Sequence, residues 1–257
     1  MADFKGDLRG SRFRHVDLSG SEMRHVDLAG SRLWGVNFYD VVMRGVYLGK
    51  VDINGEIESL VINGVDVAPY VQAEMDRREP ERVKMRPSDP AGFREAWDLV
   101  ELRWAETVER ARRLPEARLH ESVDGEWSFI ETLRHLAFAS ESWVTRAMLG
   151  EPSPWHPLSL PWDGMEDTPG VPRDRTARPT LDEALTLRLD RMATVRRVLG
   201  NLTDDQLAAD TKPVEGLGWP PPNETFPVRE CLLTVLNEEW EHRRYAERDL
   251  AVLESRA

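Results

Sequence analysis

A five-residue period of apolar positions organises the first part of the chain. From Leu8 to Ile53, every fifth residue is large and apolar, and the residue two places before each one is small or β-branched. A period of five fits neither a strand, which repeats every two residues, nor a helix, which repeats every 3.6. A chain that turns a corner every five residues would point both series inward. The large residues are Leu8, Phe13, Leu18, Met23, Leu28, Leu33, Phe38, Met43, Leu48 and Ile53.

This period resembles that of the pentapeptide-repeat family. The resemblance implies a right-handed, quadrilateral β-helix, which we place at residues 1–71. Because the end of a solenoid needs a cap, residues 72–89 are expected to form a capping helix and a linker. Basic and acidic residues nearly balance over residues 1–55, which disfavours an acidic rod that imitates DNA and favours a rigid scaffold.

The rest of the sequence has helical periodicity. Apolar residues recur three or four positions apart in four stretches, which are residues 90–113, 128–150, 181–199 and 227–253. The second stretch opens with a capping-box pattern, in which Ser128 is followed by Glu131. A long proline-rich loop separates the second stretch from the third. We therefore expect a four-helix bundle at residues 90–257 and an α+β, multi-domain fold for the whole chain.

Composition and charge narrow the classes of function. The net charge of −12 argues against a nucleic-acid partner, because contacts with phosphates need a basic surface. No apolar run approaches the roughly 18 residues of a membrane span, and residues 1–7 lack the pattern of a secretory leader. Cys231 is the only cysteine, so no disulfide can form within the chain. These features predict a cytoplasmic protein with neither nucleic-acid nor membrane partners.

Two polar residues interrupt the apolar stripe of the last predicted helix. Glu238 and His242 lie four positions apart, so their side chains share one helix face. His135 lies among apolar neighbours in the middle of the second predicted helix. Two histidines and one carboxylate hold the metal in catalytic zinc sites and in some iron and nickel sites, and they leave one coordination position of the metal open. The alternative is a surface Glu–His pair together with a hydrogen-bonded core histidine.

Two short motifs resemble those of the DinB-like superfamily. Residues 127–136 read Trp-Ser-Phe-Ile-Glu-Thr-Leu-Arg-His-Leu and look like its WS…E…HL signature, and residues 238–242 are similar to the E/H-x-x-x-H motif of its last helix. The resemblance covers about residues 87–255. It implies a divalent metal ion, zinc in the first place and nickel or iron as alternatives. The ligands that it implies are His135, Glu238 and His242.

The resemblance also implies a class of chemistry. The superfamily includes mycothiol-dependent isomerases and thiol S-transferases, and Glu238 moves this chain from the three-histidine variant toward the isomerase ligand set. Metal coordination would deprotonate a low-molecular-weight thiol, mycothiol in the first place, which then attacks a small electrophile. The expected partners are therefore that thiol and electrophile, with a homodimer as the assembly. The rivals are a metal-dependent hydrolase that uses no thiol and a non-enzymatic scaffold.

The sequence indicates a functional role less clearly for several other side chains near these motifs. His156, in the proline-rich loop, is a candidate catalytic residue or proton shuttle at the mouth of the site, and the alternative is a packed loop histidine. Cys231 is expected to be a small core residue, because nothing near it in sequence would lower its thiol pKa. Tyr245 is either a neighbour of the metal ligands or a core residue. Glu239 and Arg243 are expected to form a surface pair.

Overall fold

The computed structural model describes residue 4 and residues 6–256. Two compact units divide the chain, Met1–Gly49 and Lys50–Ala257. Within the described residues, no helix is both long and apolar enough to cross a membrane. The second unit holds β1 (Val61–Ile62), β2 (Val65–Asp66), α1 (Ala68–Arg78), η1 (Pro80–Met85), α2 (Pro90–Ala111), η2 (Glu116–His120), α3 (Phe129–Ser140), η3 (Glu141–Met148), α4 (Leu181–Asn201), α5 (Asp204–Leu207) and α6 (Val228–Ser255).

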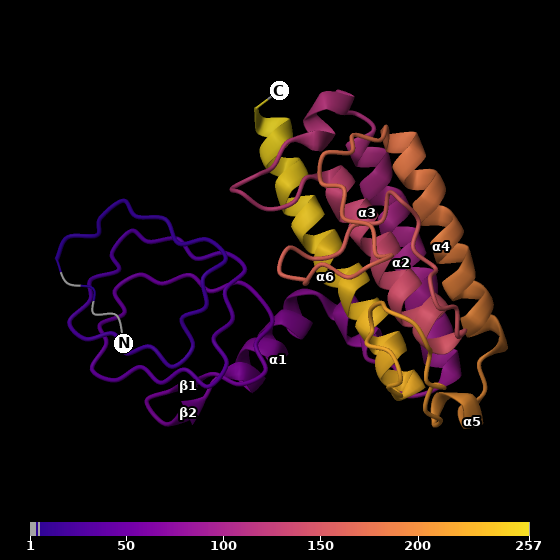
Figure 1. Ribbon diagram of the computed structural model, residues 1–257, viewed down its shortest axis with the longest axis horizontal. Helices are drawn as coiled ribbons and strands as arrows, with labels where there is room; N and C mark the ends of the chain where they lie inside the picture. The colour runs from indigo at the N-terminus through magenta and orange to yellow at the C-terminus, as the bar shows by residue number, and fades with distance from the viewer. Residues whose placement is uncertain (1–3, 5, 257) are drawn as a thin grey trace. The chain divides into compact units, whose positions relative to one another are not determined.

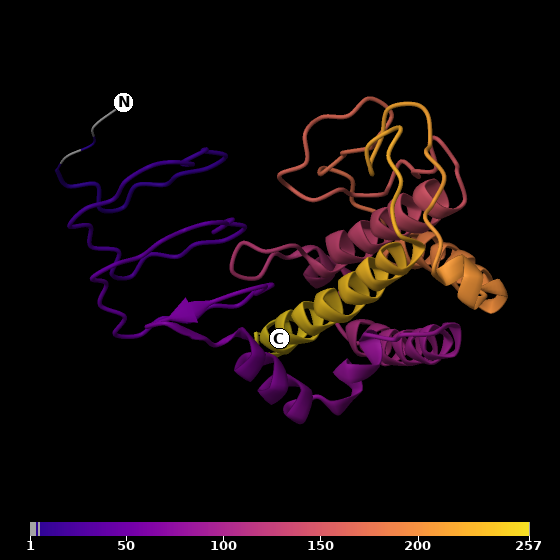
Figure 2. The same cartoon turned by 90° about the horizontal axis from the view of Figure 1, so that it is seen from below.

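The first unit winds in coils (Figure 2). Its corners alternate between two kinds. At the first kind, the Ser11 amide donates to the Leu8 carbonyl over 3.1 Å, and equivalent bonds follow at intervals of ten residues. An Asp or Asn side chain supports each of these turns, as where Asp17 Oδ1 accepts from the Ser19 amide at 2.8 Å. Over the described residues of this unit, the second kind lacks such a bond, and both kinds hold a residue with left-handed backbone, as at Gly20 (φ 69°) in the first and His25 (φ 53°) in the second. The period of the structure is therefore two pentapeptides.

The apolar series of the repeat does not form the closed core that the sequence predicts. Its ten large residues keep between 46% (Leu18) and 66% (Phe13) of their surface exposed. Over residues 6–55, the backbone hydrogen bonds are three turn bonds, and the sheet of the described residues consists of β1 and β2 alone. Without a ladder of hydrogen bonds between neighbouring coils, these apolar side chains stay exposed. The expected right-handed quadrilateral β-helix is therefore not confirmed, although the repeated corners are present.

A hairpin and two short helices follow the repeat. Asn63 and Gly64 connect β1 to β2 with φ of 50° and 83°, as a two-residue hairpin turn requires. Helix α1 begins at Ala68, not at the predicted residue 72, because Asp66 Oδ1 accepts a hydrogen bond from the Ala68 amide at 3.1 Å. The 3-10 helix η1 then leads to α2.

Helices α2, α3, α4 and α6 pack side by side as a bundle (Figure 1). The predicted capping box begins α3, because Ser128 Oγ accepts from the Glu131 amide and Glu131 Oε2 accepts from the Ser128 amide. Helix α3 continues into the π-helix η3, and α4 runs past Gly200 to Asn201. The core of the bundle is apolar, and its most buried members include Phe93, Trp97, Ile130, Leu133, Leu136, Val195, Leu236 and Leu250. The predicted helical bundle is confirmed.

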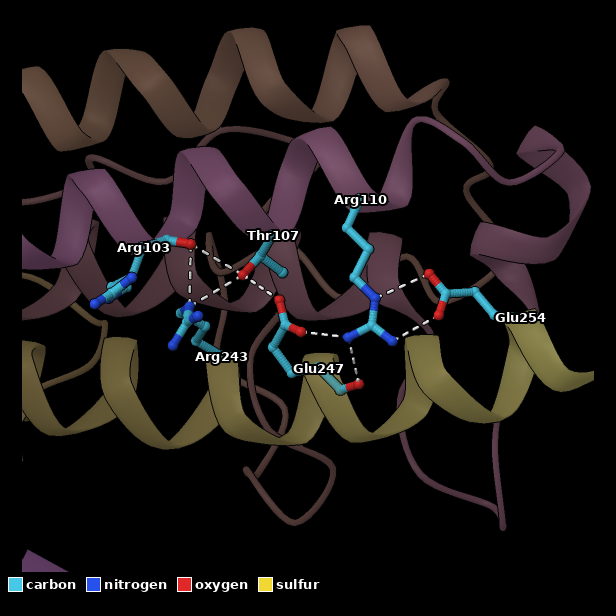
Figure 3. A network of polar contacts seen from close by, with 6 residues as sticks. All are labelled: Arg103, Thr107, Arg110, Arg243, Glu247 and Glu254. Carbon is cyan, nitrogen blue, oxygen red and sulfur yellow. Dashed lines mark hydrogen bonds and ion pairs between the residues drawn. The ribbon is translucent and has the colours of Figure 1, made fainter. Parts of the chain in front are cut away.

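A polar network joins α2 to α6 along one seam (Figure 3). Arg110 pairs with both Glu247 and Glu254. Arg243 donates to the Arg103 carbonyl and to Thr107 Oγ1, each over 3.0 Å. The predicted surface pair between Glu239 and Arg243 is therefore wrong. Glu239 instead turns into the bundle, where it is 1% exposed and pairs with Arg188 of α4.

Two long loops, residues 149–180 and 208–227, are attached to η3 by one buried arginine. Arg146 is 1% exposed. It donates to the carbonyls of Pro220 at 3.1 Å and Gly216 at 2.7 Å, and also to that of Pro152. Since a guanidinium has five N–H groups in a rigid fork, a single side chain can hold both loops.

Candidate metal centre

The three predicted metal ligands meet at one point of the bundle. His135 lies on α3, and Glu238 and His242 lie one turn apart on α6. Nε2 of His135 is 3.2 Å from Glu238 Oε2, and Nε2 of His242 is 3.0 Å from the same oxygen. One ligand atom of each residue lies within 4.8 Å of the others. The spacing on α6 and the packing of α3 against α6 produce this arrangement.

Burial differs among the three side chains. The His135 side chain is 7% exposed, whereas those of His242 and Glu238 are 20% and 30% exposed. The cluster is thus closed on the α3 side and more open on the α6 side. A site closed on one side and open on the other can keep a coordination position for a small molecule.

A hydrogen bond to the main chain sets the tautomer of His135. Its Nδ1 lies 3.0 Å from the carbonyl oxygen of Leu160. A carbonyl oxygen only accepts, so Nδ1 carries the proton. Nε2 is therefore the ring nitrogen that faces Glu238 Oε2, at 3.2 Å. A proton or a metal ion between these two atoms makes the contact favourable, and imidazole nitrogen with carboxylate oxygen is a donor set that suits zinc.

The electrostatics favour an ionised carboxylate at the centre. Burial alone would raise the pKa of Glu238, but its contacts with His135 and His242 outweigh burial, and the pKa is lowered. The opposite holds one residue later. Burial raises the pKa of Glu239, and the nearby Arg188 compensates only in part. Adjacent glutamates thus differ in role, because one faces the histidines and the other faces the core.

Aromatic rings surround the cluster. The Trp127 ring lies 4.4 Å from that of His135 and is stacked on that of His242 at 5.6 Å. Its indole N–H donates to Asp163 Oδ1 over 3.1 Å, which joins it to the loop 149–180. Tyr245 meets His242 edge-on at 6.0 Å, so it neighbours a predicted ligand. Trp127 could have been found from the sequence, because it stands one residue before the helix cap.

His156 lies apart from the three predicted ligands. Its amide donates to Glu141 Oε1 and its Nδ1 accepts from the Leu158 amide, each over 3.1 Å. Burial lowers the pKa of His156, and the charge of Arg191 lowers it further, so the ring is neutral at physiological pH. Its catalytic role remains a prediction that these contacts do not test.

The single cysteine is a core residue, as predicted. Cys231 is 1% exposed, and burial raises the pKa of its thiol to about 12. A protonated, enclosed thiol is a poor nucleophile and a poor metal ligand.

One polar residue beside the centre escaped the sequence analysis. Arg134 precedes His135 and is 1% exposed. The only signal in the sequence was an arginine between the apolar Leu133 and the predicted ligand His135. Its partners are main-chain carbonyls of the loop 149–180, and these follow no periodic pattern.

Comparison with known families gives two matches. A family model described as the DinB superfamily matches residues 99–246, more than half of the chain and a span that includes all three predicted ligands. A model of pentapeptide repeats matches residues 7–55 in eight copies. No curated protein matches the sequence.

Proposed function

Since the chain belongs to the DinB superfamily, we propose that it is a metal-dependent enzyme that uses a low-molecular-weight thiol as its nucleophile. The observation that carries the proposal is the meeting of three ligand atoms, one each from His135, Glu238 and His242, within 4.8 Å of one another. Nε2 of His135 and Nε2 of His242 lie 3.2 Å and 3.0 Å from Glu238 Oε2. Zinc is the metal that we propose first, with nickel or iron as alternatives.

The proposed chemistry divides between the metal and the chain. A bound divalent metal would supply a Lewis acid that lowers the pKa of a coordinated thiol. Glu238 offsets part of the positive charge, and His135 offers Nε2 because Nδ1 is already engaged by Leu160. The rings of Trp127 and Tyr245 both lie against the ring of His242. Mycothiol is the thiol that we propose, a small electrophile is the second substrate, and the reducing cytoplasm is the setting.

A hydrolase is the second candidate. Two histidines and one carboxylate also hold the zinc of water-activating peptidases. The same three side chains, with a water molecule in the open position, would support that chemistry.

Metal analysis of the purified, untagged protein tests the proposal first. We expect about one zinc, nickel or iron per chain, followed by a calorimetric response when mycothiol is added. His135→Ala and His242→Ala should abolish metal binding and leave the helical circular dichroism nearly unchanged. His120→Ala is the matched control, since His120 ends η2 and lies outside the cluster.

Each outcome selects one interpretation. Metal without a thiol response would favour the hydrolase. No metal after reconstitution would reject both enzymes and leave a scaffold built on the bundle. If both histidine variants keep stoichiometric metal, the ligand assignment is wrong.

A further inference from the structure

A short piece of the loop after η3 lies along α3 beside His135. We call residues 156–160 the strap. At one end of the strap, Leu160 bonds to α3 through both of its main-chain groups: its amide donates to the Arg134 carbonyl over 3.2 Å, and its carbonyl accepts from His135 Nδ1 over 3.0 Å. The position of the Leu160 carbonyl therefore sets the orientation of the His135 ring, because Nδ1 donates to it.

The Arg134 side chain holds this end of the strap in place. Its Nε donates to the Leu158 carbonyl over 2.7 Å, and its Nη2 donates to the Asp174 carbonyl over 2.5 Å. Burial lowers the pKa of this guanidinium, and main-chain carbonyls take the place of a paired carboxylate. A buried cation is stable only while such acceptors stay in position. The strap and Arg134 therefore stabilise one another.

A buried carboxylate holds the other end of the strap. Glu141, at the start of η3, is fully buried. Its Oε1 accepts from the His156 amide at 3.1 Å and from Arg191 Nε at 2.7 Å. The Ser159 amide donates to the His156 carbonyl over 2.8 Å, which closes a turn within the strap. The strap is thus held at both ends by buried side chains of one helical rod, with His135 beside Arg134.

We propose that Arg134 is a positioning residue of the metal centre. It fixes the strap so that the Leu160 carbonyl keeps the proton of His135 on Nδ1 and leaves Nε2 free for a metal ion. The outer hydrogen bond of a metal-binding histidine sets its tautomer and orientation. This inference rests on the proposed metal site, but the effect on the His135 ring can be observed without metal.

Arg146 offers a matched control. It is as buried as Arg134, lies on the same helical rod and also holds loop carbonyls. Its partners are Pro152, Gly216 and Pro220, none of which bonds to His135. Replacing either arginine removes a buried guanidinium and loosens a loop, whereas only Arg134 acts on the Leu160 carbonyl.

The first measurement is cobalt affinity and the cobalt absorption spectrum of the full chain. We expect Arg134→Met and Arg134→Lys to bind cobalt about 10- to 100-fold more weakly, with a changed spectrum. Lysine keeps the positive charge but lacks the forked guanidinium that donates to several carbonyls. Arg134→Lys therefore tests the proposal if the methionine variant does not fold. Arg146→Met should keep the wild-type spectrum and an affinity within about two-fold.

The second measurement uses the metal-free protein. Nitrogen-15 NMR should show a slowly exchanging Nδ1–H of His135 in wild type and in Arg146→Met, because the Leu160 carbonyl accepts from it, and a rapidly exchanging one in Arg134→Met and Arg134→Lys. Wild-type protection of this Nδ1–H and wild-type cobalt affinity in the Arg134 variants would overturn the proposal, as would equal losses in the variants of both arginines. If wild type binds no cobalt while the protection is still lost in the Arg134 variants, the positioning role stands and the proposed function fails.

Discussion

Arg188 and Glu239 form an ion pair inside the bundle, one residue from a proposed metal ligand. Their side chains are 2% and 1% exposed. Burial raises the pKa of Glu239 and lowers that of Arg188, so each charge depends on the other. Arg188 also lies over the ring of Trp104 at 5.8 Å. At the residue scale, the interior next to the centre is held by a charge pair rather than by apolar contact alone.

Removing one member of this pair should destabilise the fold strongly. Arg188→Met leaves the Glu239 carboxyl buried without its partner, which costs about 3–5 kcal/mol of unfolding free energy. Urea unfolding followed by circular dichroism measures the change. Arg196→Met is the matched control on the same helix, because Arg196 is 46% exposed where it pairs with Asp98 and Glu101, and it should cost less than about 1 kcal/mol. Equal losses in the two variants would contradict a stabilising role for the buried pair.

Cys231 should resist alkylation in the native protein. Burial raises its thiol pKa to about 12, so the thiol stays protonated at about pH 8 and lacks the thiolate that attacks alkylating reagents. Iodoacetamide followed by mass spectrometry should modify the urea-unfolded chain at once and the native chain only as fast as it unfolds. Rapid modification of the native chain would show an accessible thiolate and would reopen Cys231 as a nucleophile.

At the element scale, the rod formed by α3 and η3 organises the loops that have no regular structure. Arg134 and Glu141 hold the strap, and Arg146 holds parts of both long loops. The guanidinium carbon of Arg146 lies over the ring of Trp155 in the first loop, 5.4 Å from the ring centroid. Gly218 of the second loop lies so close that an added Cβ would sit 2.2 Å from the Trp155 ring and 2.9 Å from the guanidinium carbon.

Gly218→Ala should therefore separate the two loops. The added methyl has no room, and overpacking of this kind costs about 1–3 kcal/mol. Thermal unfolding and limited proteolysis of the loops would measure the effect. Gly200→Ala is the matched control: Gly200 lies within α4 and its Cβ would meet nothing within 4 Å, so this change should stabilise the helix by about 0.5–1 kcal/mol. A stable, protease-resistant Gly218→Ala protein would show that the loops adjust without strain.

The helices and the predicted ligands could be read from the sequence, because their signals are local. Ser128 and Glu131 cap α3 as predicted, and Glu238 and His242 stand out as polar positions on an apolar stripe. The bond between His135 and Leu160 depends on how a loop folds back over 25 residues, and no period in the sequence encodes that. The pentapeptide period was also local and is confirmed, since a family model matches residues 7–55 in eight copies. The β-helix expected from it is not confirmed, because closing it depends on hydrogen bonds between coils that the period alone does not encode.

At the scale of the whole molecule, the groups of the proposed centre all belong to one compact unit. The unit Lys50–Ala257 contains the three predicted ligands, Trp127, Arg134 and the strap. The unit Met1–Gly49 contains most of the repeat. We propose that the homodimer expected from the sequence forms through this unit, because its large apolar side chains are exposed.

A chain that begins at Lys50 should keep the metal centre and lose the assembly. We expect its metal affinity to stay within about two-fold of wild type, since none of the groups that position His135, Glu238 and His242 is removed. Metal titration and sedimentation of the full and shortened chains make the comparison, with the full chain as a dimer and the shortened one as a monomer. A shortened chain that folds but binds metal weakly would mean that the repeat supports the site. A full chain that sediments as a monomer would reject the homodimer and leave the metal centre untouched, because that centre needs no second copy.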